Sequence, residues 1–338
     1  MKARTILIGL AVIIALIAAF FWQRHAADAP LDKVGAVRLA APLAVAAAPI
    51  WVAQDRGFFA RAGLESTVSK CSAGKDCVDA MFRGEADLSS ATEFVAARLS
   101  FNQKDLRIVG TTAFAHDIRL LADKNKGIAS IADIKGKRLG VGIGTSGEYF
   151  LSRLLTRNGI DHDAITWVDL KPQEMDAAVS AGDVDAVLTW TPFANKVKVA
   201  LGERLVEFDG QPGEDYYFLV MGQQAWLTAQ PKVAERVMLA MIWATEWMRA
   251  HPEEARTYLV SKFGVPPADI GPLMEKIRFS IDLPQALLSA LEAESHWLEK
   301  KGNKGTPVAN SLDLIVAAPL QAAAPESVTI IRGRSGKP

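Results

Sequence analysis

A glycine-rich stretch, Gly140 to Phe150, combines hydroxyl side chains with a turn that could hold an anion. Apolar residues alternate with its first glycines and predict a short buried strand. From Phe150 onward, apolar residues recur at helical spacing, so a helix should follow the turn. The first N–H groups of a helix lack partners within it and carry the positive end of its dipole. We therefore predict that Thr145, Ser146 and Gly147 contact an anionic group.

The same residues also fit a structural interpretation. Thr145 and Glu148 have the spacing of a capping box, in which a hydroxyl and a carboxylate bind the unpaired N–H groups of the helix start. A carboxylate that faced a ligand here would repel an anion and suit an ammonium group. The sequence leaves open whether Glu148 faces a ligand or only caps its helix.

A dinucleotide site is a second alternative for this turn. Gly142-x-Gly144-x-x-Gly147 matches the fingerprint for a nicotinamide dinucleotide, and Asp169 follows a strand-like segment at about the required distance. The alternative function is thus an exported NAD-linked oxidoreductase. The motif starts deep in the chain, however, and no catalytic acid or base stands out.

Length and charge limit the possible functions. The chain has 338 residues, of which 50% are hydrophobic, and a formal net charge of zero. It can bury a sizeable core in two domains. A balanced charge without a basic stripe gives no reason to expect a nucleic acid. No metal-ligand spacing and no nucleophile–base order occur, so we predict no metal, no cofactor and no enzymatic activity.

The N-terminus predicts export. Lys2 and Arg4 precede an apolar run over residues 6–22, which is an export signal or a membrane anchor of marginal length. The segment Ala27-Asp28-Ala29 is a weak cleavage site because it contains a charge and Pro30 follows it. We assign residues 1–30 to this signal or anchor and favour an uncleaved anchor.

Cys71 and Cys77 are the two cysteines of the chain. In an exported protein, an isolated pair this close most simply forms a disulfide, which would close a small loop and stabilise only modestly. A reduced, buried and inert pair is the alternative. Zinc is disfavoured because no nearby histidine completes a tetrahedral set.

Short predicted strands and helices alternate along the first half of the chain, which predicts an α/β fold with a parallel sheet. Polar residues collect at the carboxyl ends of these strands, where open α/β sheets place their ligands. The strands are expected at residues 37–45, 64–69, 85–88, 106–112 and 118–122, and the helices between them at 50–54, 75–82 and 94–100.

Four segments, in order, carry a resemblance to a known family. They are Ala48 to Phe59, Gly84 to Ser90, Asp133 to Val141 and Ala181 to Pro192. Together they are similar to the opening helix, the first ligand strand, the linker into the second lobe and the next ligand strand of the substrate-binding proteins of sulfonate-, nitrate- and taurine-type ABC importers. The resemblance covers about residues 37–297.

This resemblance implies a type II periplasmic-binding-protein clamshell with two lobes and two crossover hinge strands. Lobe one would comprise residues 37–115 and 216–320, lobe two residues 116–215, and residues 321–338 would form a loose tail. The hinge would lie near residues 113–119 and 214–222.

In this family the ligand lies between the lobes, so we expect both lobes to supply site residues. From lobe one we select Ser90, Thr92 and Glu93, which could instead form a helix cap. Trp190 could line the site or belong to the core, and His116 at the hinge could be structural. The full set of expected ligand-binding residues is Ser90, Thr92, Glu93, His116, Thr145, Ser146, Gly147, Trp190, Thr191 and Tyr216.

The resemblance implies a monomeric, extracytoplasmic solute receptor, and an uncleaved apolar run over residues 6–22 would tether it to the inner membrane. It would capture a small organic anion or zwitterion and deliver it to a membrane permease. A thiamine-pyrimidine synthase of the same fold and a tethered sensor domain are further alternatives. The sequence does not identify the ligand, although Glu93 and Glu148 favour one that bears an amine.

Overall fold

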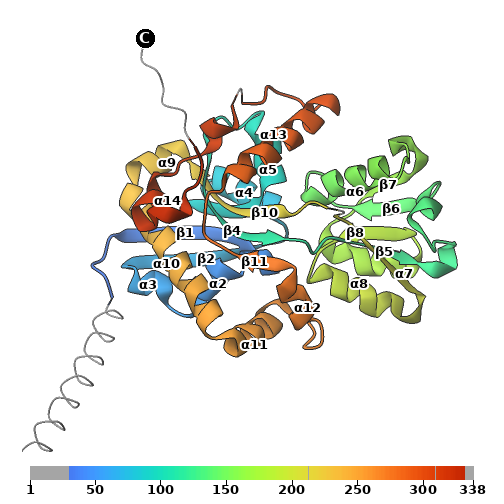
Figure 1. The fold of residues 1–338 in the computed structure, drawn as a ribbon, viewed down its shortest axis with the longest axis horizontal. Coiled ribbons are helices and arrows are strands. Elements are labelled where there is room, and N and C mark those ends of the chain that lie inside the picture. Colours follow the sequence, from blue (N-terminus) through green and yellow to red (C-terminus); the bar gives the residue numbers. More distant parts are fainter. Residues whose placement is uncertain (1–29, 212, 309, 332–338) are drawn as a thin grey trace, which may run out of the picture.

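The computed structural model describes residues 30–331, except 212 and 309, and shows two lobes, each built around a β-sheet (Figure 1). In lobe one the strand order is β11-β4-β10-β3-β1-β2, and in lobe two it is β7-β6-β8-β5-β9. The predicted N-terminal signal or anchor lies outside the described residues. Within the described part of the chain, no helix is both long and apolar enough to cross a membrane.

Lobe one has helices on both faces of its sheet (Figure 1). Its strands are β1 (Gly35–Pro42), β2 (Leu64–Cys71), β3 (Leu88–Thr92), β4 (Leu106–Ala115), β10 (Tyr216–Gln223) and β11 (Ile277–Phe279). Its helices are α2 (Ala48–Asp55), α3 (Phe58–Arg61), α4 (Gly74–Phe82), α5 (Glu93–Ser100), α9 (Gln224–Ala229), α10 (Pro231–Ala250), α11 (Pro252–Phe263), α12 (Ile270–Glu275), α13 (Gln285–Lys300) and α14 (Ala318–Ala323).

Lobe two is the smaller unit, and its sheet also lies between helices. Its strands are β5 (Arg119–Asp123), β6 (Arg138–Val141), β7 (Thr166–Asp169), β8 (Ala186–Thr189) and β9 (Leu205–Asp209). Its helices are α6 (Ser146–Arg157), α7 (Met175–Ala181) and α8 (Phe193–Leu201). The glycine-rich stretch therefore forms β6, a turn and α6, as its pattern predicts.

Two short segments connect the lobes. Residues 116–118 lead from β4 to β5, and residues 210–215 lead from β9 back to β10. Because β10 returns from lobe two in the direction opposite to β4 and β3, it pairs antiparallel with both. The expected two-lobe α/β fold is thus present, but the sheets are mixed rather than purely parallel.

The C-terminal segment is packed further than the sequence suggested. We expected residues 321–338 to be loose, but α14 continues into a 3₁₀ turn, Pro325–Ser327, and Val328 pairs with Leu283. The reason is that apolar side chains in this segment, such as Ala323 and Val328, pack against the main hydrophobic core. Residues 332–338 lie outside the described part.

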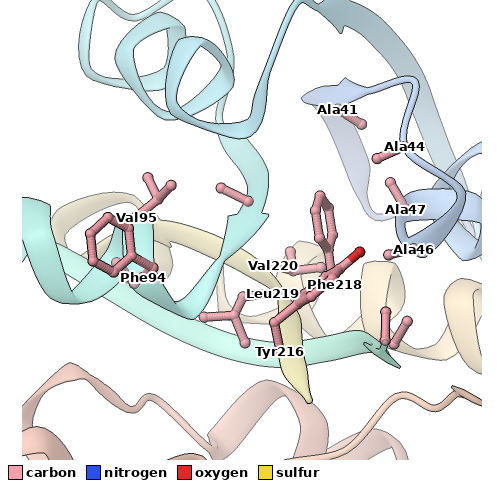
Figure 2. Packing of buried hydrophobic residues seen from close by; sticks show 14 of the residues in the cluster. Ala41, Ala44, Ala46, Ala47, Phe94, Val95, Tyr216, Phe218, Leu219 and Val220 are labelled. Atoms are coloured by element: carbon pink, nitrogen blue, oxygen red, sulfur yellow. The ribbon is translucent and has the colours of Figure 1, made fainter. Parts of the chain in front are cut away.

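The lobe-one core reaches the junction between the lobes. Figure 2 shows Tyr216 and Phe218 of β10 lying between Val95 of α5 on one side and Ala44 to Ala47 on the other. The first turn after β1 packs on β4, where the Thr112 hydroxyl donates to the carbonyl oxygen of Ala46 at 2.8 Å. Buried side chains of lobe one thus position the β10 groups described next.

Candidate ligand-binding cleft

A narrow cavity lies between the lobes and is partly open to solvent. Both lobes supply its walls. Those from lobe one are Pro42, Leu43, Ala44, Ser72, Ala73, Gly74, Lys75, Thr92, Val95, Tyr216 and Phe218, and those from the hinge and lobe two are Ile118, Thr145, Ser146, Trp190 and Phe193. Five of the expected site residues are therefore brought together: Thr92, Thr145, Ser146, Trp190 and Tyr216.

The start of α6 forms the lobe-two side of the cavity. Thr145 caps the helix, because its Oγ1 accepts a hydrogen bond of 3.2 Å from the N–H of Gly147. Ser146 is free of this role, and its hydroxyl donates to Thr92 Oγ1 at 2.5 Å. Thr92 is the N-cap residue of α5, so the starts of two helices from different lobes meet at the cavity.

The start of α4 adds a cation from lobe one. Lys75 is its second residue and places Nζ 3.5 Å from the carbonyl oxygen of Ile143, in the glycine turn of lobe two. The end of α4 that faces the cavity is the positive end of its dipole. The N-termini of α4, α5 and α6 and one ammonium group thus lie at the cavity, an arrangement that attracts anions.

Aromatic rings form the rest of the cavity. Trp190 and Phe193 meet edge to face with ring centroids 6.0 Å apart, and Tyr216 and Phe218 do so at 6.4 Å. The Tyr216 hydroxyl donates to Asp117 Oδ1 at 2.8 Å. Burial raises the pKa of the Asp117 carboxyl and of the Tyr216 hydroxyl. The cavity therefore suits a ligand with an apolar body beside its anionic group.

Three expected site residues lie just behind the cavity walls. Ser90 is fully buried, and its hydroxyl donates to the carbonyl oxygen of Leu219 at 2.8 Å. The N–H of Thr191 donates to Asp117 Oδ2 at 3.3 Å, and the N–H of Gly147 binds Thr145. These groups join neighbouring segments and do not line the cavity. Sequence position alone cannot tell whether such a residue faces a cavity or lies behind its wall.

Glu93 does not line the cavity, because Thr92 ends β3 and Glu93 begins α5, where the chain changes direction. It lines a separate groove with Tyr149 and Glu294 of α13. One carboxylate oxygen of Glu93 and one of Glu294 are buried and have no hydrogen-bond partner among the described residues. Loss of hydration raises the pKa of the Glu93 carboxyl to about 8 and that of Glu294 well above its usual range.

His116 lies at the hinge rather than in the cavity. Its Nδ1 is 3.1 Å from Asp215 Oδ1, and its Nε2 is 3.1 Å from Asp209 Oδ1. Arg119 also binds Asp209, at 2.8 Å. His116 therefore joins the two connecting segments, which is the structural alternative that the sequence left open.

The carboxylates of the glycine turn bind its own backbone. Glu148 Oε2 accepts from the N–H of Gly144 at 2.7 Å, and Asp169 Oδ1 accepts from the N–H of Ile143 at 3.0 Å. Glu148 Oε1 also pairs with Lys301 Nζ at 2.5 Å. A dinucleotide pyrophosphate would have to bind the turn amides that these carboxylates already occupy. The geometry therefore does not support the NAD alternative. Neither Glu93 nor Glu148 lines the cavity, which removes the reason to expect an amine on the ligand.

Sequence reasoning missed several cavity residues. Ser72, Gly74 and Lys75 lie within or beside the loop closed by Cys71 and Cys77, which are joined in a disulfide. Their position at a predicted helix start could have indicated that they contact an anionic ligand. Phe193 and Phe218 gave none, because an aromatic residue in a helix or strand has the same sequence pattern whether it faces the core or a ligand.

The two lobes have the periplasmic-binding type of fold. The alkanesulfonate-binding protein SsuA of Xanthomonas axonopodis, solved with bound MOPS, superimposes with a TM-score of 0.72 and 19% identity over 85% of this chain and 99% of that one. A mutant of the desulfurization enzyme DszB, solved with biphenyl-2-sulfinic acid, has a TM-score of 0.63 and 16% identity over 87% of this chain and 99% of that one. At these identities the likeness shows the fold alone.

Residues 45–255 match the family described as NMT1/THI5 like, and the chain belongs to this family. Among curated relatives, an aliphatic sulfonates-binding protein of Escherichia coli is 24% identical over 195 residues, which is 57% of this chain and 61% of that protein. A binding protein of Brucella abortus is 24% identical over 207 residues. The matched segments span only 61% to 64% of the length of these relatives.

Proposed function

We propose that this protein is an extracytoplasmic receptor that binds a small organic anion between its lobes and delivers it to the permease of an ABC importer. The observation that carries the proposal is the cavity itself. Helix starts from both lobes, one of them bearing Lys75, meet there opposite a wall of aromatic rings.

The chemistry of the walls favours a sulfonate or carboxylate attached to an apolar body. Lys75 and the amides of two helix starts suit the anionic head. Trp190, Phe193 and Phe218 suit an alkyl or aromatic body, which a bare ion such as nitrate would leave without contacts. The names of the alkanesulfonate- and aliphatic sulfonates-binding relatives support the same ligand class.

A receptor needs no catalytic group. The cavity walls therefore suit ligand binding better than they suit catalysis. The two cysteines form a disulfide, and His116 is bound at the hinge. The ligand would bias closure by contacting both lobes at once. The connecting segments 116–118 and 210–215 are short enough to act as the hinge. In this proposal, residues 6–22 keep the receptor close to its permease.

The test is a ligand screen on the purified protein. We expect butanesulfonate, MOPS and benzenesulfonate to raise the melting temperature, and nitrate and taurine to do so much less. A ligand present at 100 times its dissociation constant adds ~2.7 kcal/mol to the free energy of unfolding. Calorimetry should then give the affinity, and small-angle scattering should show compaction. If none of these anions stabilises the protein, the proposal is wrong.

A further inference from the structure

The disulfide between Cys71 and Cys77 encloses a loop that belongs to the ligand cleft. Cys71 is the last residue of β2, which is an edge strand of the lobe-one sheet. Cys77 is fully buried within the first turns of α4. The bond joins Cα atoms 5.4 Å apart, with a sequence separation of 6 residues. It therefore fixes the path of the chain between β2 and α4.

Residues inside this loop line the cavity and contact the opposite lobe. Ser72, Ala73, Gly74 and Lys75 all line the cavity. The Ser72 hydroxyl donates to Gln173 Oε1 of lobe two at 2.7 Å, and Lys75 Nζ lies 3.5 Å from the Ile143 carbonyl oxygen. The loop thus contributes to the cavity wall and to the contact between the lobes.

Within lobe one, Cys71 is paired with Pro42 of β1 at the β2 end of the loop, and the other anchors lie on its α4 side. An added Cβ at Gly74 would lie 2.6 Å from Ala91 Cβ, so α4 starts in close contact with β3. Asp76 Oδ2 accepts a hydrogen bond of 3.1 Å from the N–H of Ala73. Within the lobe-one sheet, β2 pairs with β1 alone. Without the disulfide, the junction at Cys71 and Ser72 would lose its link to α4.

We propose that Cys71 and Cys77 are positioning residues of the ligand site. Their disulfide holds Ser72 to Lys75 in the arrangement that binds the anion and meets lobe two. Breaking it leaves the folded protein with a cleft that is in the binding-competent arrangement for only part of the time. Apparent affinity falls by that fraction, so ligand capture depends on the oxidation of this pair. The proposal rests on the proposed receptor function.

A purely structural disulfide would behave differently. It would only link β2 to α4. Breaking it would then lower the melting temperature but leave the ligand affinity of the folded protein unchanged. Affinity and stability therefore have to be measured on the same samples. Leu64→Ala provides a matched control, because Leu64 is buried at the opposite end of β2 and does not line the cavity.

The experiment compares the oxidised protein, the same protein reduced with TCEP, and the C71S/C77S variant. Calorimetry with butanesulfonate at a temperature well below every melting transition should show a dissociation constant about tenfold higher in the reduced protein and in C71S/C77S. TCEP should not change the affinity of C71S/C77S, and Leu64→Ala should melt lower with the affinity of the oxidised protein. Equal dissociation constants in the oxidised and disulfide-free proteins would overturn the proposal.

The two proposals can fail separately. If the oxidised protein binds no anion, the receptor function is wrong, and amide hydrogen exchange then tests the disulfide alone. Faster exchange in C71S/C77S at residues 72–75 together with residues 143 and 173 of lobe two would support the positioning role. Faster exchange confined to β2 and α4 would overturn it.

Discussion

The hydroxyl of Thr92, at the start of α5 in lobe one, accepts a 2.5 Å hydrogen bond from the hydroxyl of Ser146, at the start of α6 in lobe two. Two helix starts from different lobes thus meet directly at the wall of the cavity. Each hydroxyl can rotate to donate to a bound anion or to its partner, so this pair is placed to couple ligand binding to closure.

Removal of the Ser146 hydroxyl should weaken ligand binding. Ser146→Ala loses one hydrogen bond from the closed cleft, worth ~1 kcal/mol, which corresponds to about a fivefold rise in the dissociation constant. Calorimetry with butanesulfonate measures it. Ser90→Ala is the matched control, because Ser90 is buried and bonded within lobe one. Equal losses in both variants would contradict a role for Ser146 in binding.

Lys75 should supply the main charge contact. Lys75→Met keeps the apolar stem and removes the ammonium group, and a lost charged hydrogen bond costs ~2 kcal/mol, or about 30-fold in affinity. The loss should shrink at high salt, because screening already weakens the wild-type contact. Lys70→Met, on the exposed end of β2, should bind like wild type. If Lys75→Met binds as tightly as Lys70→Met, the anion does not lie at the start of α4.

The buried Glu93 should make stability fall as pH rises. Burial raises the pKa of its carboxyl in the folded state from 4.5 to about 8. Between these values the folded protein keeps a proton that the unfolded chain releases, so the free energy of unfolding decreases with pH. Glu294, whose pKa is also raised, acts in the same direction. Glu93→Gln cannot ionise, so its profile from pH 5 to 8 should be flatter.

Urea unfolding at several pH values measures this effect. Glu85→Gln serves as the control, because Glu85 is exposed and its bond with Arg83 lowers the pKa of its carboxyl. The contribution of such a group is lost only at acidic pH, so its profile should run parallel to that of wild type between pH 5 and 8. A Glu93→Gln profile that is also parallel would contradict the prediction.

Gly74 should be required for the close packing of α4 against β3. Gly74→Ala brings a Cβ to 2.6 Å from Ala91 Cβ and 2.8 Å from Ala91 Cα, so helix or strand must shift. Overpacking of this kind costs ~1–3 kcal/mol. Gly271→Ala in α12 meets no atom within 4 Å and should be neutral or slightly stabilising. Denaturant unfolding compares the two, and equal stabilities would show that the contact is not tight.

Local sequence determined the helices and strands and much of the resemblance to the family. The alternating glycines before Thr145 predict β6 and the start of α6, and both form, with Thr145 as the cap. Such features depend on residues within a few positions of each other, so a single stretch suffices to specify them. The pairing of Cys71 with Cys77 is of the same local kind.

Only the tertiary structure decided which groups face the cavity. Thr92 and Glu93 are neighbours in sequence, yet one lines the cavity and the other a groove beside α13. The reason is that Thr92 ends β3 with extended backbone and Glu93 begins α5, so the two side chains leave the chain in different directions. Likewise, the Glu148 carboxylate does not line the cleft, because it binds the nearby Gly144 N–H and also Lys301, which lies 153 residues later in the chain. Such long-range contacts depend on how the two lobes pack, and no short stretch of sequence encodes that.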